Sequence, residues 1–177
     1  MEVYEAMKKR GSVRKYLEDP VPQEVLNRVL EAACSAPSWK NMQCWRFIVV
    51  SDPEIKKSLS DSLHSGNPAA KAVATAPLTI VACGDPEASG REDGKEYYLL
   101  DTGIAMQQLQ LAAYAEGLGT CWVAWFDEEK ARAACNIPEN YRVVAITPLG
   151  KPAKESNKPP RMAPGEVSFR EKWGSPL

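Results

Sequence analysis

The chain has one histidine, His64, and no pair of cysteines at the C-x-x-C spacing. Its five cysteines are scattered and odd in number, so we expect no metal site and no disulfide framework, only reduced thiols packed as small apolar groups. With 22 basic and 23 acidic residues, the formal net charge is −1 at pH 7. This balance argues against general binding to nucleic acid or to a membrane surface, so any basic site must be local.

Long apolar runs are also missing. No stretch approaches the roughly 20 apolar residues that span a bilayer. The N-terminus lacks a basic region followed by an apolar segment, so no secretory signal is expected and a cytoplasmic location is predicted. The chain has 177 residues, of which 44% are hydrophobic and 25% charged, and this predicts one globular domain.

The composition changes after Gly150. The last stretch, 151–177, contains five prolines with basic residues between them and few apolar anchors. Such a segment cannot form a core of its own. We therefore expect a single domain over 1–150 and a Pro-rich basic tail over 151–177, packed on that domain or on a partner subunit.

Hydrophobic periodicity and turn residues predict a mixture of helices and strands. Helices are expected at 23–33, 53–63, 97–116 and 128–135, and strands at 46–50, 78–83, 120–126 and 141–149. The charged, glycine-containing segment 85–95 is predicted to be a loop, and we hypothesise that it covers a pocket. Because no βαβ unit recurs, the predicted fold class is α+β.

The helix expected at 97–116 is apolar on nearly every side. Asp101 and Glu116 are its only charged residues. A helix of this kind is buried in a core or in a subunit interface. Because the domain is small, the sequence favours a homodimer.

Two guanidinium groups and a hydroxyl lie within five residues near the N-terminus, in the stretch Arg10-Gly11-Ser12-Val13-Arg14. Arginine presents a fork of donors that fits phosphate oxygens, and serine and backbone N–H groups can complete such a site. A solvated basic loop is the alternative for a motif this short.

A second polar cluster follows the first predicted helix. It has Ser38, Asn41 and Gln43 flanked by Trp39 and Trp45. Hydrogen-bonding groups beside flat apolar surfaces suit a planar heteroaromatic ring. The alternative is an ordinary loop between a helix and a strand.

Four separated motifs, taken together, resemble the nitroreductase family of FMN-dependent oxidoreductases. They are R-G-S-V-R-K-Y, A-P-S-W-K-N-M-Q-C-W-R-F, E-G-L-G-T-C-W and L-G-K-P, in this order between about Tyr4 and Pro152. The resemblance implies an α+β sandwich with a central mixed or antiparallel sheet flanked by helices. It also implies an obligate homodimer with two FMN sites at the interface.

The resemblance assigns site residues position by position. It implies that Arg10, Ser12 and Arg14 hold the flavin phosphate and ribityl chain, with Gly11 contributing its backbone. The turn with Pro37, Ser38 and Asn41 would approach the isoalloxazine ring, often from the other subunit. Further positions implied are Trp122, Val123 and Ala124 beside flavin N5, and Lys158 or Arg161, of which Arg161 is favoured, at the phosphate.

The implied reaction takes hydride from NADH or NADPH through flavin N5 to a nitroaromatic, quinone or similar small acceptor, in two steps. No side chain is expected to act as the catalytic group. The alternatives are a flavin-binding or storage protein, a non-catalytic dimeric interaction protein, or a superfamily variant such as a reductive dehalogenase. Cys44 stands where the family commonly has proline. Together with the aromatic residues Trp39 and Trp125, it would reshape the pocket above the flavin, so the identity of the acceptor is left open.

Overall fold

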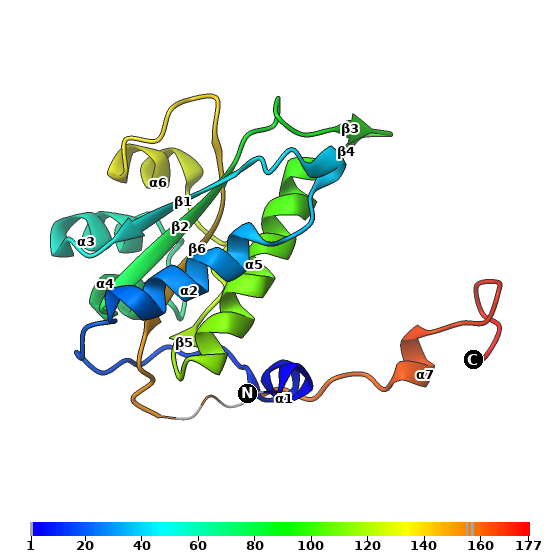
Figure 1. The fold of residues 1–177 in the computed structure, drawn as a ribbon. Coiled ribbons are helices and arrows are strands. Elements are labelled where there is room, and N and C mark those ends of the chain that lie inside the picture. The colour runs from blue at the N-terminus through cyan, green and yellow to red at the C-terminus, as the bar shows by residue number, and fades with distance from the viewer. Residues whose placement is uncertain (1, 155, 157) are drawn as a thin grey trace.

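The computed structural model describes residues 2–154, 156 and 158–177, and its centre is a four-stranded sheet (Figure 1). Every neighbouring pair of strands is antiparallel, and the strand order is β1-β2-β6-β5. The strands are β1 (Trp45–Val50), β2 (Leu78–Gly84), β5 (Gly119–Thr120) and β6 (Arg142–Gly150). The antiparallel sheet with flanking helices confirms the predicted α+β class.

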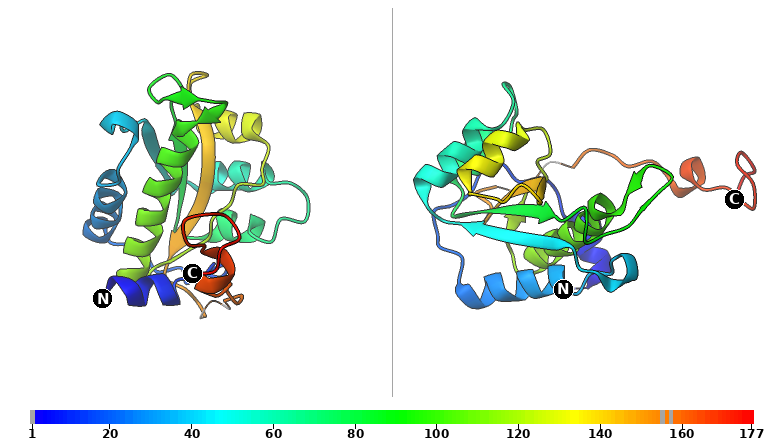
Figure 2. Two further views of the ribbon diagram at one scale, coloured as in Figure 1. Left: turned by 90° about the vertical axis from the view of Figure 1, so that its right-hand side faces the viewer. Right: turned by 90° about the horizontal axis from the view of Figure 1, so that it is seen from above.

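Helices cover both faces of this sheet (Figures 1 and 2). One face packs against α2 (Gln23–Cys34) and α5 (Tyr97–Ala115), and the other against α3 (Pro53–Asp61), α4 (Ala70–Thr75) and α6 (Glu128–Ala134). The central strand β2 is apolar along its length because its side chains alternate between the two layers. Ile80 and Ala82 enter the core beneath α2 and α5, whereas Val81 and Cys83 enter the other core.

The long helix α5 has a buried side and an exposed side in this single chain. Met106, Leu109 and Ala113 are fully buried against α2 and the sheet. Leu100 and Ile104 are 56% and 43% exposed, and α1 (Val3–Lys9), which packs against α5, exposes its own apolar side chains. The apolar character predicted for every side of this helix is therefore present, but only one side is covered here.

The strand expected at 120–126 is wrong in its extent, because the ladder of β5 ends at Thr120. The next backbone N–H, from Cys121, donates to the side-chain Oγ1 of Thr147 at 3.2 Å instead of to a carbonyl of β6. Pairing returns only at Val123, which exchanges two hydrogen bonds of 3.0 and 2.9 Å with Ile146. The segment 121–126 thus stays beside β6 without forming a continuous strand.

The predicted loop at 85–95 contains a small hairpin made of β3 (Arg91–Glu92) and β4 (Lys95–Glu96). Its two turn residues, Asp93 and Gly94, both have positive φ, at 49° and 74°. An Asp-Gly pair tolerates this conformation and is typical of two-residue hairpins. The hairpin leads directly into the N-terminal end of α5.

The tail is joined to the domain at its beginning and extends from it at its end. Leu17 N–H donates to the Lys151 carbonyl at 2.9 Å, and Ala153 N–H donates to the Lys15 carbonyl at 3.0 Å. Beyond α1 the tail leaves the domain and carries the one-turn helix α7 (Pro164–Val167) (Figures 1 and 2). Within the described ranges, no helix is long and apolar enough to cross a membrane.

Gly119 is needed where the N-terminal segment approaches β5. A Cβ atom added there would lie 2.7–2.9 Å from three side-chain atoms of Val13. We expect Gly119→Ala to lower the free energy of unfolding by about 1–3 kcal/mol, because Val13 is buried and cannot move away freely. Urea denaturation measures this change.

Gly165→Ala is the matched control, because nothing lies within 4 Å of an added Cβ at that position. It should change stability by less than about 0.5 kcal/mol. Equal stabilities of the two variants would contradict the close approach at Gly119.

Candidate functional site

The segment that follows α1 is extended and lies along β5. Ser12 forms a parallel bridge with Thr120, and Val13 N–H donates to the Thr120 carbonyl at 2.8 Å. In an extended segment, alternate side chains point to opposite sides. Arg10, Ser12 and Arg14 therefore share one side, opposite Gly11 and Val13, and the predicted phosphate-binding residues are brought together.

Arg161 of the tail joins this group. Burial lowers the pKa of the Arg10 guanidinium, and the positive charge of Arg161 lowers it further. Arg10 Nη2 donates to the amide oxygen of Gln107 at 3.3 Å, which orients it without neutralising it. We call Arg10, Arg14 and Arg161, together with Ser12, the arginine cluster.

The thiol of Cys121 lies beside the same cluster and does not neutralise it. Burial raises the pKa of Cys121, and the opposing effects of Arg14, Ser12 and Arg10 do not reverse the shift. The thiol is therefore neutral at physiological pH. Among the described residues, no ion pair involves Arg10, Arg14 or Arg161. Positive charge held together without an acid indicates a site for an anion.

A cavity of about 650 Å³ adjoins the arginine cluster, between the extended segment, α4 and the tail. This volume is within the range of about 300–1,000 Å³ typical of small-molecule sites. Its described lining has no acidic side chain and consists of Ser12, Val13, Arg14, Lys15, Tyr16, Pro68, Lys71, Thr75, Ala153, Lys154 and Ser156. Sequence reasoning missed Lys71, because an isolated lysine in an Ala-rich segment has no motif around it. The volume, the basic lining and the arginine cluster fit the phosphate end of a flavin mononucleotide.

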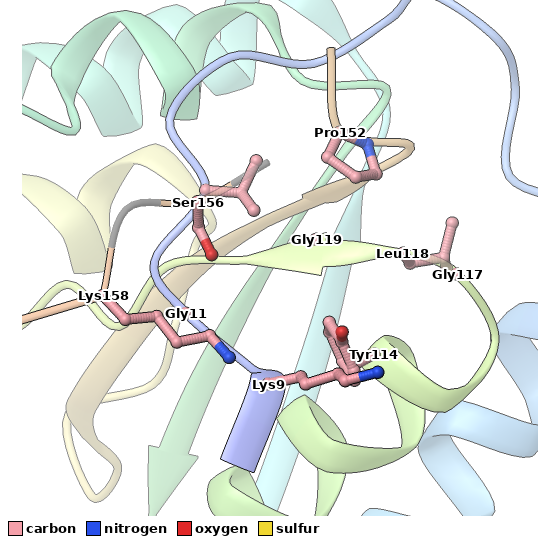
Figure 3. Close-up of a pocket in the computed structure, with 10 residues that line it drawn as sticks. Lys9, Gly11, Tyr114, Gly117, Leu118, Gly119, Pro152, Ser156 and Lys158 are labelled. Atoms are coloured by element: carbon pink, nitrogen blue, oxygen red, sulfur yellow. The ribbon is translucent and has the colours of Figure 1, made fainter. Parts of the chain in front are cut away.

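A second cavity, of about 520 Å³, lies on the Gly11 and Val13 side of the same segment (Figure 3). A Cβ atom on Gly11 would collide with Ser156 Oγ, so this glycine lets the tail approach the segment. Lys158 Nζ donates to the Lys8 carbonyl at 2.6 Å, at the end of α1. Of the two basic residues predicted at the phosphate, Lys158 is bonded at the end of α1, whereas the charge of Arg161 acts on Arg10. Which of the two meets a phosphate stays a prediction.

The turn predicted to approach the flavin ring is separate from both cavities, and none of Pro37, Ser38 and Asn41 lines either of them. Ser38 Oγ accepts a hydrogen bond from Gln43 N–H at 2.9 Å, and the Ser38 carbonyl accepts one from Asn41 N–H at 3.0 Å. Lys40, Asn41 and Gln43 all have positive φ. We call residues 38–43 the 38–43 turn. It lies at the N-terminal end of α5, beside the hairpin (Figure 1).

The positions predicted beside flavin N5 lie in the irregular segment along β6. Val123 is buried and bridged to Ile146, whereas Trp122 and Ala124 are exposed. The next residue, Trp125, accepts a hydrogen bond on its carbonyl from Asn67 Nδ2 at 2.9 Å, and its ring centroid lies 5.6 Å from that of His64. This places an exposed aromatic surface next to the segment.

The fold is that of an α+β protein, and the predicted site residues Arg10, Ser12 and Arg14 lie on one side of its N-terminal segment beside a basic cavity. The sequence matches the model of the nitroreductase family over residues 7–151, and the chain belongs to that family.

Similar proteins cover nearly the whole chain. A "putative NADH dehydrogenase/NAD(P)H nitroreductase" of Methanothermobacter thermautotrophicus is 33% identical over 98% of this chain and 88% of its own length. A crystal structure of a nitroreductase family protein from Clostridium novyi is 42% identical, with a TM-score of 0.83 over 100% of this chain and 97% of that one. An FMN-dependent nitroreductase from Clostridium difficile is 30% identical, with a TM-score of 0.81 over 94% and 98% of the two chains.

An anion that enters the arginine cluster should stabilise the fold, because it relieves the repulsion between guanidinium groups. Inorganic phosphate at ten times its dissociation constant should add about 1.4 kcal/mol, which raises the melting temperature by roughly 3–6 °C for a chain of this size. Arg161→Ala should remove most of this shift. Differential scanning fluorimetry in a phosphate titration measures it.

Lys158→Ala is the control for the tail, because its ammonium group is bonded to the Lys8 carbonyl. It should keep the response to phosphate. If Lys158→Ala abolished the response and Arg161→Ala retained it, the assignment of Arg161 to the cluster would be wrong.

Proposed function

We propose that this protein transfers hydride from NADH or NADPH, through bound FMN, to a nitroaromatic, quinone or similar small acceptor. Its family makes it an NAD(P)H-dependent oxidoreductase that uses FMN. The observation that best supports the proposed site is that Arg10, Ser12 and Arg14 share one side of the extended segment, with the charge of Arg161 acting on Arg10 and no acidic partner among the described residues. The acceptor, the two-step course and the cytoplasmic location expected from the sequence are predictions.

The chain's own groups bind and orient the cofactor in this proposal. Arg10 and Arg161 grip the phosphate oxygens, because a guanidinium can donate two parallel hydrogen bonds. Ser12 adds a hydroxyl donor, and Arg14 and Lys71 supply positive charge along the cavity. FMN held by these residues would supply the redox chemistry, as carrier of electrons between the nicotinamide and the acceptor.

The site is incomplete in one chain. The 38–43 turn is bonded to Asp101, and Arg10 is bonded to Gln107, six residues further along α5. At 3.6 residues per turn, these two positions are about 120° apart around the helix axis. The turn and the arginine cluster therefore approach different sides of α5. We propose that the turn of one subunit completes the site formed by the arginine cluster of the other.

A homodimer also accounts for the exposed apolar surface. The large apolar side chains exposed on α1 and the first half of α5 are Val3, Tyr4, Met7, Leu99, Leu100 and Ile104. Several large apolar side chains left in contact with water are typical of an interaction site. In this proposal a second copy covers the surface, and the projecting tail packs along that copy.

The purified protein should be yellow, and NADH or NADPH should bleach it under anaerobic conditions. Arg10→Ala should weaken FMN binding roughly 10- to 100-fold, because charge-assisted hydrogen bonds to the phosphate are lost. Titration of the apoprotein, followed by quenching of FMN fluorescence, measures the affinity.

Arg28→Ala is the matched arginine control, since Arg28 pairs with Glu116 at the surface, away from the cavity. It should bind FMN like the wild type. A yellow protein that neither nicotinamide reduces would indicate flavin storage instead of catalysis. A colourless protein that ignores added FMN would contradict the proposed function.

Ile104→Glu should separate the subunits, because it places a charge in the apolar surface of α5 that the second copy is expected to cover. Sedimentation velocity should show monomers, and FMN binding should fall with the loss of the dimer. Ile55→Glu is the control, on α3 at the opposite side of the sheet, where Ile55 is 36% exposed. A monomeric wild-type protein would contradict the dimer.

A further inference from the structure

Asp101 is a buried carboxylate in an otherwise uncharged helix. It is 4% exposed and is the only charged residue within α5. Burying a carboxylate is costly unless hydrogen bonds replace its water. No basic side chain among the described residues pairs with Asp101, so its hydrogen-bond donors must carry this role.

Three donors surround the carboxylate, and they come from two parts of the chain. Trp39 N–H donates to Oδ1 at 3.0 Å, from the 38–43 turn. Ser89 Oγ–H donates to Oδ2 at 2.9 Å, from the loop that leads to the hairpin. Cys44 S–H, between the 38–43 turn and β1, approaches Oδ2 at 3.7 Å. Burial and the charge of Asp101 raise the pKa of Cys44, so the thiol keeps the proton that it donates.

The Trp39 ring makes a second contact between the same two segments. A Cβ atom added to Gly90 would lie 2.5–2.9 Å from three atoms of the ring, so the ring lies directly on the glycine backbone. Lys40 Nζ lies 4.5 Å from the Trp39 ring centroid, and the Tyr97 ring centroid lies 6.4 Å away. The turn and the hairpin loop are thus packed together as well as bonded to one carboxylate.

The 38–43 turn needs such an external support. Lys40, Asn41 and Gln43 have φ values of 45°, 59° and 50°, in the left-handed region that is unfavourable for residues with a Cβ. Conformations of this kind persist only where the surroundings hold them, and they cluster at functional sites. The bond from Trp39 N–H to Asp101 lies immediately before the first of these residues.

We propose that Asp101 is a positioning residue that couples the 38–43 turn to the 85–96 hairpin loop and so sets how the turn meets the flavin ring. The effect on the flavin rests on the proposed function, whereas the coupling between the turn and the hairpin loop does not depend on it. The hairpin loop carries exposed charges at Arg91, Glu92 and Lys95. A change in the position of the hairpin loop would be transmitted to the flavin through Asp101 and Trp39.

Hydrogen–deuterium exchange without flavin tests the coupling. Asp101→Asn keeps the shape of the side chain and removes its charge, and exchange should become roughly tenfold faster in peptides covering 38–43 and 88–97. Ser89→Ala removes a donor on the hairpin side only, and it should also speed exchange in the 38–43 turn. Thr102→Val is the control, since the neighbouring buried Thr102 hydroxyl has no partner in the described structure.

Ligand binding separates this role from that of the phosphate site. Asp101→Asn should weaken the binding of FMN and of riboflavin by the same factor, roughly tenfold, because the substitution acts at the ring end of the ligand. Arg10→Ala should weaken the binding of FMN and leave the affinity for riboflavin nearly unchanged. Unchanged exchange in the turn for both Asp101→Asn and Ser89→Ala would overturn the coupling. A wild-type protein that binds neither flavin would overturn the proposed function, while the exchange result would still decide the coupling.

Discussion

Backbone pairing fixes the segment that carries the arginine cluster, which has no acidic partner in the part of the chain that the structure describes. The pairing of Ser12 with Thr120 and the hydrogen bond from Val13 N–H fix the extended segment against β5. Gly119 permits this approach, since any side chain there would meet Val13. The segment then has to present Arg10, Ser12 and Arg14 on one side, and the charge of Arg161 in the tail acts on Arg10. The fold thus holds like charges together, and a phosphate bound there, as proposed, would relieve their repulsion.

The second constraint is the length and placement of α5. One helix supports the arginine cluster through Gln107 and the 38–43 turn through Asp101, but on different sides. Its remaining apolar side is exposed in a single chain. Association of two copies would cover that side and bring the two half-sites together, so that one helix would organise the core, the interface and both parts of the flavin site.

Several features were predictable from sequence because they depend on local patterns. The apolar runs of β2 and β6 and the stripe of α2 are of this kind, and the R-x-S-x-R spacing of an extended segment places three side chains on one side. The hairpin of β3 and β4 was not predicted, because segment 85–95 was expected to be a loop. The end of the strand at Thr120 was not predictable, since the next N–H, from Cys121, donates to a hydroxyl far away in the sequence, Thr147 Oγ1. Lys71 and Asp101 could likewise not be identified as site residues from the sequence, because their roles arise from contacts with segments far away in the sequence.

The central claim is that each flavin site combines the arginine cluster of one subunit with the 38–43 turn of the other. Mixed dimers of an Arg10→Ala, Arg14→Ala chain and an Asn41→Ala chain, purified with two different affinity tags, test it most directly. If the claim holds, one site of the mixed dimer is intact and the other carries every substitution, so half of the wild-type FMN is bound with wild-type affinity. If both parts belonged to the same chain, every site would be defective and no wild-type site would remain, which would contradict the account.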